Sequence, residues 1–328
     1  MPLRKLVPGA FAAVALCVCT FAYAPLADGG AVAAALGATP HAAPKAPVVG
    51  GCQIFPSDNA WNQDVSKLPV RKDSAKLVKS ITTTGARSKL HADFGGGGAY
   101  GIPFLVVPKK QKVWPVHYTA YGSESSRGPF PIPPHAPVEG GAKSDGDRHV
   151  IVVQSGKCHL YELYRAFWRG RRWDADSGVN WNLASNARRK LGFTSADAAG
   201  LPIFPGLARY REVHDGAIHH ALRFTVAATQ RGYIYPATHY ASSSHNKALP
   251  PMGLRLRLKA RYSLAHFHGQ ARVILEALKT YGMIVADNGS SWYITGAASP
   301  KWNDSDLDQL KSVPGGAFVA VDTGPIRH

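Results

Sequence analysis

A carboxylate inside an apolar run is the first candidate for chemistry in this sequence. Glu162 lies near the middle of a strand-like run over residues 159–168. Strand alternation puts it on one face with Cys158, Leu160 and Tyr164, and a carboxylate buried there needs a cation or a hydrogen-bond donor. Burial can raise the pKa of such a group until it serves as a general acid. The alternative is a structural ion pair with an interior arginine.

A second carboxylate, Asp147, stands just before the strand that should pair with this run. Residues 149–154 and 159–168 flank a short loop with Gly156, a pattern typical of an antiparallel hairpin. The hairpin would bring Asp147 and His149 opposite the end of the second strand. Glycosidases use two carboxyl groups about 5 to about 9 Å apart. Asp147, His149 and Glu162 are therefore candidate catalytic residues of a hydrolase, with a turn role for Asp147 as the alternative.

Basic strands further along the chain suggest a different chemistry. His219 and Arg223 alternate on one face of a run over 218–227, and Arg255 and Arg257 share one face of the next basic run. Beside a tyrosine such as Tyr240, an arginine could neutralise a uronate carboxylate while histidine or tyrosine removes the adjacent proton. This is the chemistry of a polysaccharide lyase. The alternative for the second basic run is an ordinary solvated face.

Two tryptophans, Trp168 and Trp173, bracket a turn that contains Arg169, Arg171 and Arg172. A tryptophan beside cations can stack on a sugar ring and bind its acidic substituents. We expect one of the two to contact a substrate, and core packing is the alternative for both.

Motifs of cofactor and metal enzymes are missing from the sequence or lack their structural context. Residues 96–101 match G-x-G-x-x-G, but Pro103 follows where a helix should begin, so the match indicates a flexible glycine loop. There is no phosphate-loop lysine motif, no H-E-x-x-H and no G-x-S-x-G. His266 and His268 do not have the spacing of a metal site. We expect neither a cofactor nor a metal.

The elements that would position these residues are mostly short strands. Apolar and aromatic runs broken by Gly, Pro and Asn are typical of strands. Such runs occur at residues 104–107, 113–119, 149–154, 159–168, 179–184, 218–227, 232–235, 254–260, 283–286 and 292–295. The proline-rich segment 128–137 excludes helix and central strand and indicates a surface loop.

Helices are expected at few places. A short helix is predicted from residue 194 or 195 to 199, and the clearest one covers 270–281, where an apolar stripe ends at Gly282. A last helix over 304–311 starts with acids and ends with a lysine. The expected fold class is mainly β, an antiparallel sandwich or jelly-roll-like body with a few helices near the C-terminus. An α+β arrangement is the alternative.

The N-terminus has the pattern of a secretory signal. Arg4 and Lys5 precede an uncharged run that ends on small residues, with cleavage near Ala24 or near Ala33. An uncleaved anchor is the alternative, since the run nearly reaches the ~20 residues of a membrane span. We assign residues 1–33 to a signal peptide, 34–50 to an Ala-, Pro- and Gly-rich linker and 51–328 to one β-rich domain. The protein would be secreted or periplasmic, without stable membrane insertion.

Removal of this signal leaves two cysteines, Cys52 and Cys158. Two cysteines in an exported chain most simply form one disulfide, which here would close a loop of about a hundred residues. Two free buried thiols are the alternative.

The charge balance bears on partners and not on the fold. The chain has 38 Lys and Arg against 21 Asp and Glu, a net charge of +17, and loss of Arg4, Lys5 and Asp28 with the signal leaves +16. For an exported protein, an acidic polysaccharide or another anionic component of the cell envelope is the expected partner, and nucleic acid is not. The alternative is the general basic bias of a proteome.

Three runs resemble those of an uncharacterised family of secreted bacterial proteins. They are residues 195–203, residues 277–289, and residues 147–150 together with 160–163. The resemblance covers the chain from Cys52 onward. It brings no named activity and so assigns no catalytic residue.

Three functions fit these observations. The leading hypothesis is a secreted carbohydrate-active enzyme that cleaves a polysaccharide, by carboxylate acid–base hydrolysis or by His/Tyr/Arg elimination. The others are a noncatalytic binding protein for acidic glycans or the cell envelope, and a structural envelope domain. An enzyme should gather Glu162, Asp147 or His219 around one open cleft, whereas a structural protein would close all of them off from solvent.

Overall fold

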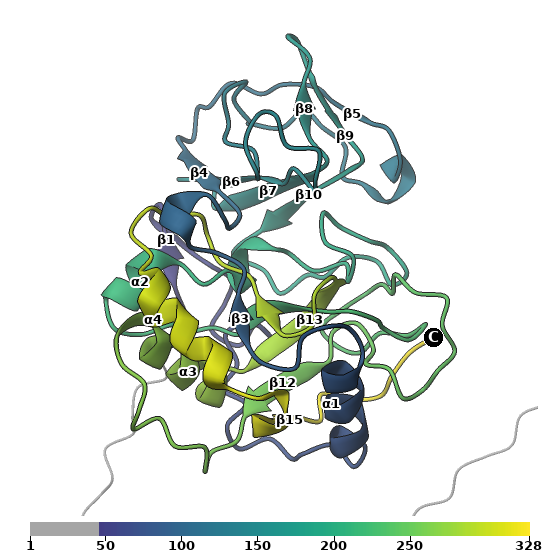
Figure 1. Ribbon diagram of the computed structural model, residues 1–328. Helices are drawn as coiled ribbons and strands as arrows, with labels where there is room; N and C mark the ends of the chain where they lie inside the picture. The colour runs from purple at the N-terminus through teal and green to yellow at the C-terminus, as the bar shows by residue number, and fades with distance from the viewer. Residues whose placement is uncertain (1–45) are drawn as a thin grey trace, which may run out of the picture. The chain divides into compact units, whose positions relative to one another are not determined.

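Residues 46–328 are described by a computed structural model, and they are mainly β, as the sequence indicates (Figure 1). The expected signal peptide and residues 34–45 of the expected linker lie outside the described residues. The last residues of that linker form β1 (Val48–Val49), which pairs antiparallel with β2 (Cys52–Gln53).

The hairpin predicted from the sequence forms the middle of a four-stranded sheet. Its strands are β4 (Phe104–Val107), β6 (Val150–Gln154), β7 (His159–Tyr164) and β10 (Ser177–Asn182), in the order β10-β7-β6-β4. β6 and β7 are antiparallel, whereas β4 and β6 are parallel. Ile151 and Val153 of β6 pack into a larger hydrophobic cluster and Val150 and Val152 into a smaller one. Because both faces of β6 are covered, its sequence is a continuous apolar run.

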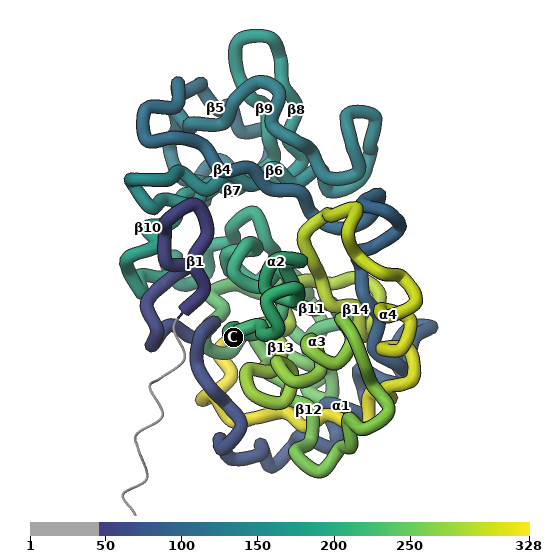
Figure 2. The backbone as a smooth tube through the Cα atoms, turned by 90° about the vertical axis from the view of Figure 1, so that its left-hand side faces the viewer, coloured from purple at the N-terminus to yellow at the C-terminus, as the bar shows by residue number. Residues whose placement is uncertain are grey.

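A three-stranded sheet covers the smaller cluster. It consists of β5 (Val116–Tyr118), β8 (Phe167–Trp168) and β9 (Trp173–Ala175), in the order β5-β9-β8. Figures 1 and 2 show it beside the four-stranded sheet. The proline-rich segment contributes Phe130 and Ile132 to this cluster, so it is more than the surface loop that its prolines indicate.

The larger cluster is built around a six-stranded mixed sheet. Its strands are β3 (His91–Ala92), β11 (Leu222–Val226), β12 (Arg255–Leu258), β13 (Met283–Asn288), β14 (Tyr293–Ile294) and β15 (Phe318–Ala320), in the order β15-β12-β13-β11-β14-β3. β11 runs parallel to β13, and β14 runs parallel to β3. The sheets of the described residues thus combine parallel and antiparallel pairs.

The helices follow the sequence prediction in part. α3 (Gly269–Thr280) is confirmed, and α4 (Asp304–Asp308) continues into a short 3₁₀ turn. α1 (Ser74–Thr83) and α2 (Tyr210–His214) were not foreseen. The expected helix over 194–199 is wrong, because the Ser195 hydroxyl accepts from the Asp197 amide and stabilises a turn instead. No helix among the described residues is long and apolar enough to cross a bilayer.

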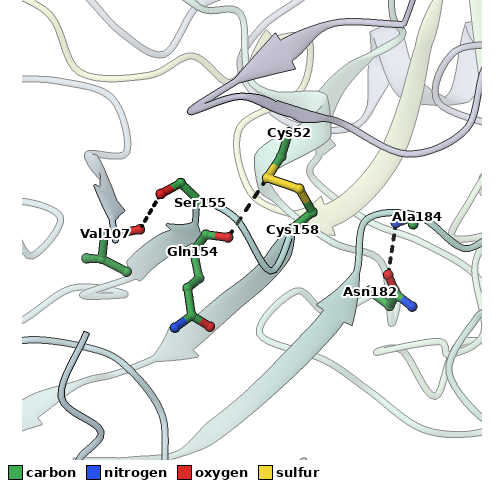
Figure 3. Close-up of a disulfide and its surroundings, with 7 residues drawn as sticks. All are labelled: Cys52, Val107, Gln154, Ser155, Cys158, Asn182 and Ala184. Atoms are coloured by element: carbon green, nitrogen blue, oxygen red, sulfur yellow. Dashed lines mark hydrogen bonds between the residues drawn. A yellow bond between two sulfur atoms is a disulfide. The ribbon is translucent and has the colours of Figure 1, made fainter. Parts of the chain in front are cut away.

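The expected disulfide is confirmed. Cys52 of β2 is bonded to Cys158 at the end of the β6–β7 turn, with 5.2 Å between the Cα atoms (Figure 3). The bond ties the start of the described chain to a central hairpin across 106 residues. A disulfide fits an extracellular protein.

Replacing both cysteines should destabilise the protein. A Cys52→Ala/Cys158→Ala variant should lose about 2–5 kcal/mol of unfolding free energy, because the unfolded chain regains the freedom of a long loop. Urea unfolding followed by circular dichroism measures this, and reductant should reproduce the loss in the wild type. Equal stability of the wild type and the double variant would contradict the prediction.

Candidate functional site

Two adjoining cavities, lined largely by polar and charged side chains, are here called the carboxylate cleft. They have volumes of about 610 and about 180 Å³ and share Asp147, Asp287 and Asn288. Five carboxylates line the cleft, together with the cationic side chains Arg223, Arg231 and His149. The carboxylates are Asp93, Glu139, Asp147, Asp197 and Asp287.

A buried ion pair organises the floor of this cleft. Arg223 of β11 binds Asp197 through two hydrogen bonds, Nε to Oδ2 at 2.9 Å and Nη2 to Oδ1 at 2.8 Å. Its Nη1 donates to the Thr295 hydroxyl at 2.8 Å, and Nη2 also reaches Asp287 at 3.3 Å. Burial opposes the charged guanidinium, but Asp197 and Asp287 hold the pKa of Arg223 above its usual range. The cation is therefore permanent and already neutralised.

A β-bulge directs Asp287 into the cleft. The register between β11 and β13 shifts so that Phe224 faces Val285 while Thr225 faces Asp287, which leaves Ala286 as the extra residue. The carbonyl of Ala286 instead accepts from the Ala199 amide at 3.0 Å, inside the turn that carries Asp197. One irregularity thus positions both carboxylates that contact Arg223.

The environment of Asp287 gives its carboxyl group an unusual proton affinity. Burial raises its pKa, and the negative charge of Asp197 adds to this, whereas Arg223 and the Asn288 amide oppose it. The result is a pKa of about 6. Because Asp197 takes two of the hydrogen bonds of Arg223, Asp287 receives only a longer one. A carboxyl group of this kind can exchange a proton near neutral pH.

His149 is held as an imidazolium. Its Nδ1 lies 2.6 Å from Glu139 Oε2, and its Nε2 lies 3.2 Å from the carbonyl of Ala196. Since both partners are acceptors, both ring nitrogens must carry a proton. Burial lowers the pKa of His149, but Glu139 outweighs it and raises the pKa to about 9. At neutral pH this histidine is therefore a cation whose two ring nitrogens both donate, and its candidate catalytic role would be to stabilise negative charge.

Asp147 is presented to the cleft by a strained backbone. Arg148 has φ of +50°, a left-handed conformation that costs free energy in a residue with a side chain. Its buried guanidinium donates to the carbonyls of Ala166, Ala142 and Ser144, which fixes this conformation. Asp147 remains exposed and lines both cavities. It makes no ion pair among the described residues.

Asp93 completes the group from the end of β3. Its amide donates to the carbonyl of Ile294 at 2.8 Å, and its side chain lines the smaller cavity. Burial raises its pKa, and Glu139 and Asp147 raise it further against the opposing charge of Arg223. No cluster of His, Cys, Asp and Glu among residues 46–328 has the arrangement of a metal site. The cleft therefore offers carboxylate chemistry from its own side chains.

Glu162 lies outside the cleft. It faces the larger cluster, as strand alternation predicts, and is fully buried. Its carboxylate accepts from the amides of Ile203 and Phe204 and from the Trp181 indole, so N–H donors satisfy it and not the interior arginine of the alternative. Burial raises its pKa to about 7. Closed off from solvent, Glu162 stabilises the 203–204 turn and cannot reach a substrate.

The lyase set is not assembled either. His219 is exposed beside the Tyr281 hydroxyl at the end of α3 and does not line the cleft. Arg255 is buried, with burial lowering its pKa to about 9, and it donates to the carbonyls of Ala60, Gln63 and Tyr281. The side chain of Arg255 therefore does not belong to a solvent-facing basic surface, which the sequence predicts.

Arg257 is used in the same way, because its Nη1 donates to the carbonyls of Val65 and Leu68. These two arginines of β12 hold the segment that follows β2. The alternation read from the sequence is real, but the face that it defines is covered by chain.

The three aromatic candidates lie in different surroundings. Trp173 is buried and donates to the carbonyl of Ile132, so core packing is its role. Trp168 is half-buried against it and lines another cavity of about 540 Å³ with Arg169. Tyr240 lines the carboxylate cleft, stacked on His239 with ring centroids 5.8 Å apart.

The cleft thus brings together Asp147, His149, Arg223 and Tyr240 from the predicted residues. Sequence reasoning missed Asp93, Glu139, Asp197 and Asp287. One signal was available: Asp287 directly follows the predicted strand 283–286 and precedes the turn residues Asn288 and Gly289. Such a position often presents a side chain at a sheet edge, whereas Glu139 has no comparable signal.

The His149–Glu139 pair should make stability depend on pH. The folded-state pKa of His149 is raised, so its contribution is complete below about pH 6.5 and is lost as the pH rises through about 9. The change is on the order of 3 kcal/mol. Glu139→Gln should flatten this decline in urea unfolding between pH 6 and pH 9.5.

The matched control is Glu276→Gln, which removes an exposed carboxylate on α3. It should follow the pH dependence of the wild type. If Glu139→Gln also follows the wild-type curve, the pair does not hold the proton of His149.

Comparison of the chain with protein-family models, with curated proteins and with solved structures finds no match. The resemblance to an uncharacterised secreted family stays a prediction, and the chemistry of the site is argued from its own residues.

Proposed function

We propose that this protein is a secreted hydrolase that cleaves a glycosidic bond, with Asp287 as the general acid and Asp147 as the second carboxylate. The observation that carries the proposal is the raised pKa of Asp287, about 6, in an open cleft that Asp147 also lines. Glycosidases need one carboxyl group that holds a proton and one that is ionised. In this assignment Asp287 protonates the leaving oxygen while Asp147 acts on the sugar or on a water molecule.

The cleft has the size and lining that a sugar chain requires. The larger cavity, about 610 Å³, falls within the range of small-molecule sites and is also lined by Tyr121, Tyr164 and Tyr240. Tyrosine rings can stack on sugar faces while their hydroxyls bond the sugar hydroxyls. This lining supports a carbohydrate substrate.

Elimination is less well supported than hydrolysis. A lyase needs a free cation for the uronate carboxylate and a neutral base for the adjacent proton. Arg223 is neutralised by Asp197, and both nitrogens of His149 face acceptors. Arg231 is the cation of the cleft that makes no ion pair among the described residues, and its Nε donates to the Tyr240 hydroxyl. The excess of carboxylates also disfavours a uronate at the point of cleavage. We therefore propose that the sugars flanking the cleaved bond are neutral.

Secretion belongs to the same proposal. The disulfide fits an oxidising compartment, and the sequence pattern of residues 1–33 predicts export. A polysaccharide substrate outside the cell would match this location.

Release of reducing ends from a panel of neutral and acidic polysaccharides tests the reaction. Asp287→Asn should lower kcat by about 100-fold or more, because the leaving oxygen loses its proton donor. Asp147→Asn should have a similar effect. Asp308→Asn is the matched control, since it makes the same carboxylate-to-amide change at an exposed position of α4 outside the cleft, and its kcat should stay within about twofold. Ultraviolet-absorbing unsaturated products would instead indicate elimination.

The pH profile tests the role of Asp287 separately. A general acid must be protonated, so kcat/KM should fall as the pH rises through about 6, the pKa of this group. The profile should lack this limb in Asp287→Asn, whose residual activity has no titrating acid. A wild-type rate that keeps rising between pH 6 and pH 8 would exclude Asp287 as the acid.

A further inference from the structure

A second cavity, here called the basic pocket, shares no residue with the carboxylate cleft. Its volume is about 540 Å³, and it lies between β1, α2 and the segment 297–301. β1 and α2 are both seen in Figure 2. The residues that carry the argument are Phe104, Arg209, Tyr210, Arg211, Glu212 and Lys301.

The charge of the basic pocket is opposite to that of the cleft. Arg209, Arg211 and Lys301 line it against one carboxylate, Glu212. Both oxygens of Glu212 are occupied, Oε1 by Arg209 at 2.8 Å and Oε2 by His220 at 3.2 Å. Although burial opposes it, these partners hold the pKa of Glu212 at about 2. The carboxylate is thus fully engaged in the wall, and the remaining positive charge faces the cavity.

Arg209 itself has an unused donor. The residue is 3% exposed, its Nη1 donates to the carbonyl of Phe204 at 2.8 Å, and its Nη2 binds Glu212. Its buried Nε has no hydrogen-bond partner among the described residues. A buried guanidinium N–H without an acceptor is unfavourable, so Arg209 adds to the positive charge of the wall without being fully compensated.

The other two cations are accessible. Arg211 pairs with Asp215 at 2.7 Å, but both side chains are largely exposed, so a ligand can compete for the guanidinium. Lys301 makes no ion pair among the described residues, and its ammonium group lies 5.7 Å from the centroid of the Tyr210 ring. A ligand here could therefore contact an ammonium group and the aromatic ring beside it.

The apolar part of the lining defines the rest of the ligand. Phe104 and Tyr210 offer aromatic surface, and Val48 of β1 is 64% exposed at the rim. We propose that the basic pocket binds an acidic sugar residue, a ring that carries a carboxylate or another oxyanion. An inorganic oxyanion shares the charge chemistry and lacks the ring.

The basic pocket is a specific candidate site for the acidic partner that the net charge predicts. The strand face of Arg255 and Arg257 is covered by chain, whereas the basic pocket is open to solvent. The polymer would be gripped here by its acidic residues, independently of any cleavage in the carboxylate cleft.

Isothermal titration of the purified protein with digalacturonate, inorganic phosphate and neutral cellobiose tests the site. The variant is Arg211→Gln/Lys301→Gln, which changes two accessible cations and leaves Arg209 in place. The matched control is Lys76→Gln/Lys79→Gln, which removes the same charge from the exposed face of α1. Mass spectrometry of acetylated protein adds a local readout, because bound ligand should protect the Lys301 amine.

Digalacturonate should bind the wild type and the α1 control equally and bind Arg211→Gln/Lys301→Gln about tenfold more weakly. It should protect Lys301, and cellobiose should not. Competition by phosphate would show that the oxyanion alone is recognised, while its failure would show that the ring contributes; both support the site.

The inference is overturned if digalacturonate does not bind, if cellobiose binds as tightly, or if both double variants lose affinity equally. Titration of Asp287→Asn keeps this result separate from the proposed reaction. That variant should bind digalacturonate like the wild type, whether or not the carboxylate cleft is a hydrolase site.

Discussion

The ion pair between Arg223 and Asp197 is the interaction on which the cleft depends. Burying a guanidinium and a carboxylate is costly, and removing either partner from such a pair costs about 3–5 kcal/mol because the other charge is left uncompensated. Here the pair joins β11 to the turn 194–200, and Thr295 links it to the end of β14. It therefore holds together segments that lie far apart in the sequence.

The same pair explains why Asp287 differs from an ordinary aspartate. The guanidinium has a fixed set of five N–H donors, and Asp197 and Thr295 take the best directed of them. Asp287 shares Nη2 at 3.3 Å and feels the negative charge of Asp197 as well as burial. Because Asp197 takes most of the positive charge of Arg223, Asp287 receives less of it, and the pKa of Asp287 is raised to about 6.

How much of the fold and of the cleft could be predicted from the sequence depends on how far apart in the chain the interacting residues lie. Local patterns predicted the β6–β7 hairpin, α3 and the Cys52–Cys158 bond, because alternation, an apolar stripe and cysteine pairing are read from neighbouring residues or from composition. Glu162 was placed correctly on the inner face, but its partners come from Trp181 and residues 203–204. No local pattern in the sequence predicts those N–H donors.

The site was predicted only in part, for the same reason. Asp287 enters the cleft through a bulge whose extra residue bonds to a turn 87 positions earlier in the chain, Ala286 to Ala199. Arg255 looked solvent-facing because alternation defines two faces and cannot say which of them another segment covers. Contacts between segments that are far apart in the chain determine the positions of both side chains, and no local pattern in the sequence predicts those contacts.

The net charge of the chain does not show where charge of either sign is concentrated. The chain carries +17, yet the carboxylate cleft is lined by more carboxylates than cations, while a separate pocket is basic. Surface potential governs which polymers approach, and local groups govern which bond reacts. Acidic residues of a polymer can be held at the basic pocket while a neutral segment occupies the cleft, where a uronate would meet repulsion. Opposite charges at the two sites therefore favour a substrate with both kinds of residue over a uniformly acidic one.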